Sequence, residues 1–181
     1  MAKKGNCAIC DIIEKGSEFT LFDNENCMAV LADKPTGDGH VQLFTKNHFT
    51  ILEQVPDKLV GEMFTIANKL STATFEALGM QGTNIIVTNG VAAGQKHAHC
   101  LVNIIPRSEN DGLSLDWTPK QLTEEEMSTV ELNVKEQIEK IGEEDESEVE
   151  KTEEKKSEEK KGDENKKKDP NYLLKSIERI P

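Results

Sequence analysis

The sequence predicts an α+β fold in which an antiparallel sheet packs with a long helix, followed by a C-terminal helix and a charged tail. Residues 27–32 and 40–45 are rich in apolar residues typical of strands, and the turn-forming residues 33–39 join them, so they predict a hairpin. Residues 57–78 repeat apolar side chains every three or four positions, and Gly79 follows, as expected at the end of a helix. The short links favour antiparallel strands, because parallel crossovers need a dozen or more residues.

Two further strands and a second helix are predicted after the long helix. Residues 83–88 form a strand closed by Asn89 and Gly90, and residues 98–105 form another that ends before Pro106. The second helix starts near Thr123, which forms a capping box with Glu126. One apolar stripe then follows the helix: Met127, Val130, Val134, Ile138 and Ile141.

The composition changes sharply after residue 141. Of the 28 residues at 142–169, 13 are acidic and 8 are lysine. This segment therefore has too few apolar side chains to offset the conformational entropy that ordering would cost. We therefore expect a domain at 1–118, an amphipathic helix at 119–141 and a disordered linker at 142–169, with an interaction arm as the alternative for the linker. Residues 170–181 predict a short helix that docks on the domain or on a partner.

The charge balance excludes some classes of partner. The 181 residues include 34 acidic and 22 basic side chains, a formal net charge of −12, which argues against binding to nucleic acid or to an anionic membrane surface. No apolar run approaches the roughly 20 residues of a membrane span, and the first residues lack the apolar part of a secretion signal. We expect a cytoplasmic protein whose four cysteines are free thiols or metal ligands.

A C-x-x-C motif near the N-terminus is a candidate metal site. Cys7 and Cys10 could complete a tetrahedral zinc site with two of the four histidines, which are His40, His48, His97 and His99. The alternative is a pair of thiols without a metal. Cys27 and Cys100 lie in apolar strands, where cysteine is more often a small core residue.

Residues 97–103 carry polar side chains at alternate positions of a predicted strand. His97, His99, Leu101 and Asn103 would share one face, which suggests a site, although a solvated edge strand would also explain the pattern. The preceding residues 89–96 are rich in small side chains. Glycines there let backbone amides approach a phosphate, and Lys96 could add a positive charge.

Residues 89–107 resemble the signature segment of the histidine-triad (HIT) family. The preceding features agree in order: the C-x-x-C motif, a hairpin carrying Gly39 and His40, Lys46-x-His48, the long helix and residues 82–85. The resemblance covers about residues 5–110 and implies a HIT-like antiparallel sheet of about five strands packed with the long helix. It also implies a homodimer built through residues 57–78 and 83–88.

The resemblance places His99, Leu101 and Asn103 at the three triad positions, with Gln95 and Arg107 fixing the register. It therefore implies that Leu101 occupies the position of the catalytic nucleophile. Leucine has no lone pair to attack phosphorus. His97 lies four residues before Leu101, about 13 Å along an extended strand, too far to replace it. No catalytic residue is assigned, and nucleotidyl hydrolase or transferase activity is expected to be weak or lost.

The same resemblance implies a structural zinc ion held by Cys7, Cys10, His48 and His99. It further implies a pocket for a nucleotide or another small phosphate-bearing ligand. The candidate ligand-binding residues are Asp33, His40, Gln95, Lys96, His97 and Asn103. Two alternatives stay open: an active nucleotide phosphohydrolase or transferase with a non-standard residue such as His97, and a protein-interaction module with a vestigial pocket.

Overall fold

The structure is a computed structural model that describes residues 7–159, with side chains described for residues 7–141. The chain divides into two units, Met1–Leu115 and Asp116–Pro181. The helix predicted at 170–181 lies outside the described residues. Among the described residues, no helix is both long enough and apolar enough to cross a membrane.

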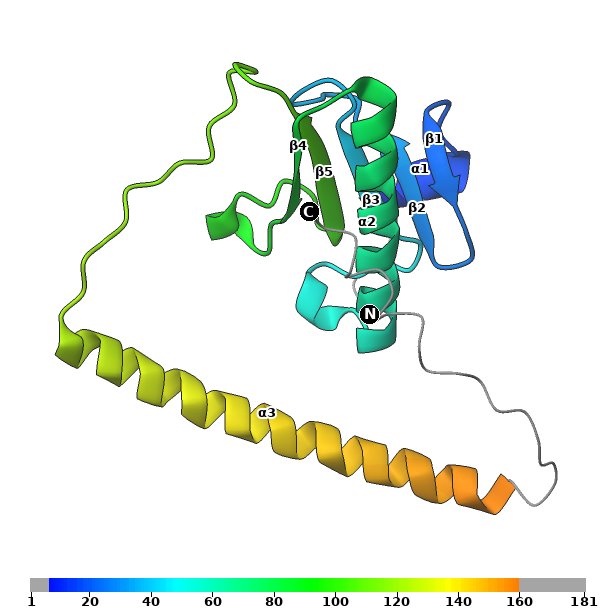
Figure 1. Cartoon of the computed structure of the whole chain (residues 1–181). Helices are drawn as coiled ribbons and strands as arrows, with labels where there is room; N and C mark the ends of the chain where they lie inside the picture. The colour runs from blue at the N-terminus through cyan, green and yellow to red at the C-terminus, as the bar shows by residue number, and fades with distance from the viewer. Residues whose placement is uncertain (1–6, 160–181) are drawn as a thin grey trace, which may run out of the picture. The chain divides into compact units, whose positions relative to one another are not determined.

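The first unit is a five-stranded antiparallel sheet with strand order β1-β2-β3-β5-β4 (Figure 1). The strands are β1 (Thr20–Asp23), β2 (Cys27–Leu31), β3 (Val41–Thr45), β4 (Gly82–Val87) and β5 (Leu101–Arg107). The predicted α+β fold with about five antiparallel strands is confirmed, as is the hairpin of β2 and β3. Strand β1 was not predicted, because its four residues are too few to show a clear alternation of apolar and polar side chains.

Strand β5 starts later than the sequence predicts. The expected strand covered residues 98–105, but the sheet pairing of β5 begins at Leu101. The Cys100 N–H donates to the Phe49 carbonyl at 2.6 Å instead of to a neighbouring strand. His97 and His99 therefore precede the strand, and only Leu101 and Asn103 follow its alternation.

Helix α2 (Asp57–Leu78) covers one face of the sheet, as predicted from its periodicity (Figure 1). Its buried side chains Met63, Ile66 and Ala67 belong to one apolar cluster with Val102 and Ile104 of β5. The helix ends at Gly79, whose left-handed backbone (φ 62°) lets its N–H return to the Phe75 carbonyl.

Helix α1 (Ala8–Lys15) contributes to a second apolar cluster, which lies on the other side of the sheet. Ile9 is 1% exposed and packs with Phe44 of β3 and Leu101 of β5. Since residues alternate between the two faces of a strand, Leu101 belongs to the α1 side and Val102 to the α2 side. Two short 3-10 helices, Leu52–Gln54 and Val91–Ala93, complete the unit.

The second unit contains helix α3 (Glu124–Glu159). The predicted capping box is present: the Thr123 N–H and hydroxyl both donate to the Glu126 carboxylate, and the Glu126 N–H donates to the Thr123 hydroxyl. The backbone of α3 continues beyond Ile141 into the segment expected to be a linker. Closely spaced Glu and Lys residues in that segment favour helix by i,i+4 attraction.

Candidate metal centre and adjoining polar face

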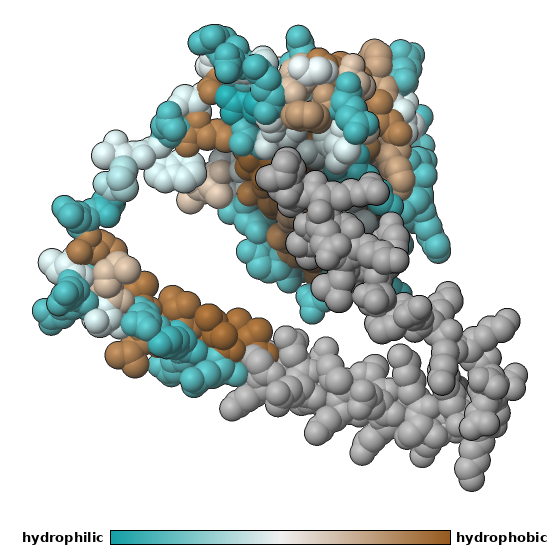
Figure 2. Space-filling model, viewed as in Figure 1, coloured by the Kyte–Doolittle hydropathy of each residue, from teal (hydrophilic) through white to brown (hydrophobic). Residues whose placement is uncertain are grey.

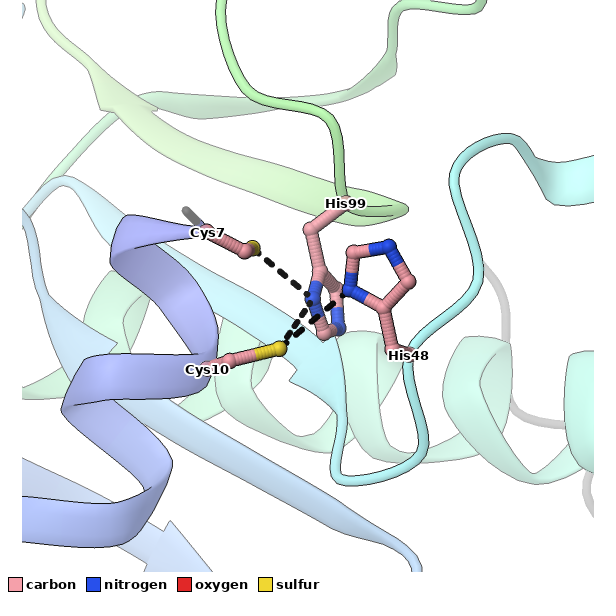
Figure 3. Close-up of side chains that lie close together, drawn as sticks. All are labelled: Cys7, Cys10, His48 and His99. Carbon is pink, nitrogen blue, oxygen red and sulfur yellow. Dashed lines mark hydrogen bonds between the residues drawn. The ribbon is translucent and has the colours of Figure 1, made fainter. Parts of the chain in front are cut away.

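Four side chains from three parts of the first unit meet at one point (Figure 3). Cys7 stands at the N-cap position of α1 and Cys10 lies in its first turn, so the C-x-x-C spacing directs both thiols the same way. His48 lies in the loop after β3, and His99 lies just before β5. Their ligand atoms lie within 4.8 Å of one another, and Cys7, Cys10 and His99 are buried.

The distances between these atoms fit a tetrahedral metal site. The Cys7 and Cys10 sulfurs lie 3.5 and 3.7 Å from His99 Nδ1, and the Cys10 sulfur lies 3.2 Å from His48 Nδ1. Metal–sulfur bonds of about 2.3 Å and metal–nitrogen bonds of about 2.0–2.1 Å at a tetrahedral angle place sulfur and nitrogen about 3.5 Å apart. The four residues can therefore hold one metal ion.

The ring of His99 is fixed in the orientation that a metal ligand needs. Its Nε2–H donates to the Thr45 carbonyl at 2.8 Å, which leaves the Nδ1 lone pair directed at the two thiols. Burial, assisted by the nearby His48 and His97 rings and opposed by the bond to Thr45, lowers the pKa of His99. The ring is thereby held in the neutral form that binds metals.

The other two cysteines take no part in this cluster. Cys27 and Cys100 are buried in the apolar cluster under α2, as the sequence predicts. Burial raises the pKa of each thiol to about 11, so both stay protonated and unreactive at neutral pH.

A polar face adjoins the metal cluster on the α1 side of the sheet. Asn103 of β5 lies directly opposite Gln42 of β3, and both are partly exposed. His40 is 5% exposed; its Nδ1 accepts the Thr36 N–H, so its Nε2–H donates to the Asn103 side-chain oxygen at 3.0 Å. His40 thus fixes the amide orientation of Asn103 and leaves the amide N–H groups as the donors of this face.

The next position along the same face is apolar. Leu101 is 9% exposed and lies directly opposite Phe44, within the cluster formed by α1, β2 and β3. A buried hydrocarbon side chain therefore separates the metal cluster from the amide of Asn103.

The small-residue loop before His99 is held by two amide side chains. Gln95 accepts the Gly90 N–H and donates to the carbonyls of Thr50 and His97. Asn89 accepts the Leu52 N–H and donates to the Glu53 carboxylate. With its oxygen and nitrogen both engaged, Gln95 supports the loop. The other predicted loop residues differ in exposure: Lys96 is exposed and His97 half-buried, while Asp33 is exposed in the β2–β3 loop.

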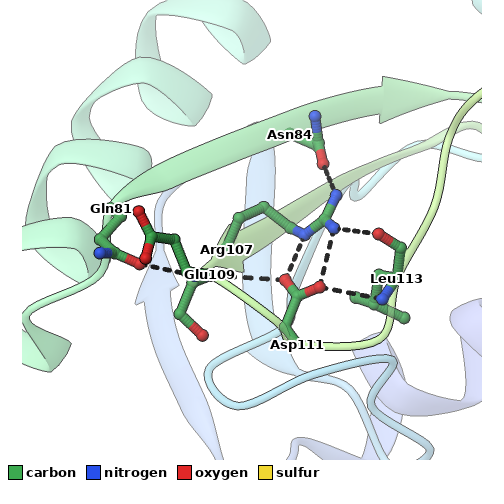
Figure 4. A network of polar contacts seen from close by, with 7 residues as sticks. Gln81, Asn84, Arg107, Glu109, Asp111 and Leu113 are labelled. Carbon is green, nitrogen blue, oxygen red and sulfur yellow. Dashed lines mark hydrogen bonds and ion pairs between the residues drawn. The ribbon is translucent and has the colours of Figure 1, made fainter.

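Arg107, at the end of β5, is engaged in a separate network (Figure 4). Its guanidinium binds both carboxylate oxygens of Asp111 and also donates to the Asn84 side chain and the Leu113 carbonyl. These bonds hold the pKa of Asp111 well below its usual range. Arg107 therefore holds the chain segment after β5, and its charge is balanced by Asp111.

Sequence reasoning missed two contributors to these sites. Gln42 alternates with His40 and Phe44 in the predicted strand 40–45. Pairing this strand with residues 101–105 places Gln42 opposite Asn103, which is the signal that identifies it. The Thr45 carbonyl that orients His99 is a backbone atom, and no residue type signals it.

A family model described as HIT domain matches residues 15–110, more than half of the chain. The chain belongs to the HIT-domain family. The HIT domain thus contains the sheet, α2, His48 and His99, whereas Cys7 and Cys10 lie just before the matched residues.

Two curated relatives have named activities. The chain is 33% identical over 120 residues to the adenylylsulfatase HINT3 of Arabidopsis thaliana, covering 66% of this chain and 59% of that protein's length. It is 31% identical over 120 residues to the adenosine 5'-monophosphoramidase HNT1 of Saccharomyces cerevisiae, covering 65% of this chain and 73% of that protein.

A solved structure of the family holds a metal. The zinc-bound histidine triad family protein of Mycobacterium smegmatis is 27% identical and superposes with a TM-score of 0.57, covering 64% of this chain and 84% of that one.

Metal analysis of the purified chain tests the cluster. We expect about one metal ion per chain without added metal, and far less in Cys10→Ser, which replaces a thiolate by a poor ligand. Cys27→Ala, which removes a buried thiol outside the cluster, should retain the wild-type metal content. Equal metal in Cys10→Ser and wild type, or none in either, would contradict the assignment.

Proposed function

We propose that this chain binds a nucleotide or another small phosphate-bearing ligand on the polar face of Gln42 and Asn103. A structural zinc ion supports this face, and nucleotidyl hydrolase or transferase activity is weak or lost. The observation that carries the proposal is the pair of residues at alternate positions of β5, a buried Leu101 beside a donor-bearing Asn103.

The donor set supports zinc in a structural role. Two thiolates and two imidazoles are ligands that zinc prefers, and the zinc-bound relative belongs to the same family. Four protein ligands leave no position for water or substrate, which is typical of structural zinc. His99 uses one ring nitrogen for the cluster and the other for Thr45, so it cannot also serve as a nucleophile.

The site lacks a nucleophile where the family pattern requires one. Leu101 offers only C–H groups, and Phe44 packs against it. His97 lies outside β5, in the loop held by Gln95, so the strand does not bring it to the position of Leu101. Loss of a covalent nucleophile lowers turnover by up to about 10⁶-fold in a serine protease, which gives the scale of the expected loss.

The remaining polar groups favour binding an anion. Asn103 presents amide N–H donors because its oxygen is engaged by His40, and Lys96 on the preceding loop is exposed. Both relatives bear names of enzymes that act on adenosine 5'-phosphate derivatives. AMP is therefore the first ligand to test.

We also propose that the chain forms a homodimer through α2 and β4. Strand β4 is an edge of the sheet, and such an edge is able to pair with a second chain. Four large apolar side chains on these two elements are between 40% and 46% exposed: Phe64, Phe75, Leu78 and Ile85. Their burial in a dimer would remove this apolar surface from water.

Calorimetry on the metal-loaded full chain tests ligand binding. We expect AMP to bind and Asn103→Leu to weaken its binding about tenfold or more, since a hydrogen bond to a charged group contributes roughly 1.5–3 kcal/mol. Adenosine, which lacks the phosphate, should bind more weakly and respond little to the substitution. Gln121→Leu, at an exposed position in the segment before α3, is the matched control. No binding of AMP by the wild type, or equal binding by Asn103→Leu, would contradict the proposal.

Hydrogen exchange at two protein concentrations tests the dimer. The outward amides of β4 should exchange slowly at high concentration and faster on dilution, because pairing with a second chain protects them. Strand β1, the other edge of the same sheet, is the internal control and should exchange at one rate throughout. Exchange of β4 that is fast and independent of concentration would argue for a monomer.

A further inference from the structure

Helix α3 carries a continuous apolar row that remains exposed in the structure. Figure 2 shows brown, apolar surface along the part of α3 whose side chains are described. Its members are each between 50% and 60% exposed: Met127, Val130, Val134, Ile138 and Ile141. We call these five residues the α3 stripe.

The spacing of the α3 stripe is the same in both directions. Successive members lie three, four, four and three positions apart, so they form one narrow face about 21 Å long. This order makes the stripe a short palindrome centred on Val134. Between Ile141 and the end of α3 at Glu159 the sequence has a single large apolar residue, Val149, so the stripe does not continue along the helix.

We propose that the α3 stripe binds the α3 stripe of a second copy of this chain, in antiparallel orientation, with Val134 on the two-fold axis. A palindromic row matches itself when one helix is reversed: Met127 then lies opposite Ile141, and Val130 lies opposite Ile138. All five side chains of each helix find an apolar partner, as a symmetric interface between identical chains requires. A one-heptad shift would place some of them against polar residues.

The charges beside the stripe select the antiparallel orientation. On one flank, reversal brings Glu131 close to Lys135 of the second copy; on the other flank it brings Glu126 close to Lys140. In a parallel pair opposite flanks meet, and Glu126 would face Glu131 of the second copy, a repulsive like-charge contact. Antiparallel helix dipoles add to the same preference.

Disulfide trapping on the full, metal-loaded chain tests both pairing and orientation. Three single variants are compared with the wild type under the same diamide treatment: Val134→Cys, Met127→Cys and Leu132→Cys. Val134 faces its own copy, so Val134→Cys should form covalent dimers at least about tenfold faster than the other two. In the antiparallel register two copies of residue 127 lie about 21 Å apart, beyond the Cα separation of about 7 Å that a disulfide can bridge.

Leu132 controls for random collision, because it is 71% exposed and lies outside the stripe. Comparable trapping of Met127→Cys and Val134→Cys would show a parallel pair and overturn the proposed orientation. Trapping of Val134→Cys no faster than Leu132→Cys would overturn the pairing itself.

A charge exchange in the Val134→Cys background provides a second measurement. Lys135→Glu brings the carboxylate of residue 135 close to that of Glu131 of the second copy, once on each side of the two-fold axis. This repulsion should slow trapping roughly tenfold, the scale of a few surface ion pairs. Adding Glu131→Lys restores opposite charges, both within the helix and between the copies, and should recover the rate. A trapping rate that is unchanged by both substitutions would contradict the predicted contact between Glu131 and Lys135 of the second copy.

Discussion

The orientation of the His99 ring determines how the metal cluster is assembled and where β5 begins. One nitrogen is bound to the Thr45 carbonyl at the end of β3, and the other faces the thiols of α1. This single side chain connects the N-terminal helix, the loop after β3 and the start of β5. It also explains why β5 begins at Leu101, since the chain must turn His99 toward the cluster before it joins the sheet. An eight-residue helix such as α1 is marginal on its own, so the cluster and the burial of Ile9 are what hold it.

The start of β5 then decides the chemistry of the adjoining face. Strand alternation directs Leu101 and Asn103 to the α1 side of the sheet. Leu101 packs in the apolar cluster of α1, and Asn103 bonds to His40. His40, which accepts the Thr36 N–H at Nδ1, fixes which end of the Asn103 amide is presented. The result is a face that presents the amide donors of Asn103 beside the buried hydrocarbon side chain of Leu101.

Much of this arrangement was predictable because it rests on local periodicity. The spacing of apolar residues predicted α2, and Thr123 with Glu126 predicted the start of α3. The four candidate metal ligands came from the resemblance to a family, since spacing alone left open which histidines join Cys7 and Cys10. Two features that were not predicted depend on contacts between residues distant in sequence. The Cys100 N–H bonds to the Phe49 carbonyl, so β5 begins only at Leu101, and the Thr45 carbonyl orients His99. The amide of Gln95, a candidate ligand-binding residue, is bonded to three backbone groups, and its contact with a ligand stays a prediction.

The proposal of weak or lost nucleotidyl chemistry rests on two residues, because Leu101 and Asn103 stand at two of the three triad positions of this HIT domain. Its most direct test compares hydrolysis of adenosine 5'-phosphoramidate by the metal-loaded wild type, by Leu101→His and by Leu101→His with Asn103→His. We expect negligible turnover by the wild type, little gain from the single substitution because Asn103 still stands at the third triad position, and clearly faster release of AMP by the double variant. Wild-type turnover equal to that of the double variant would contradict it.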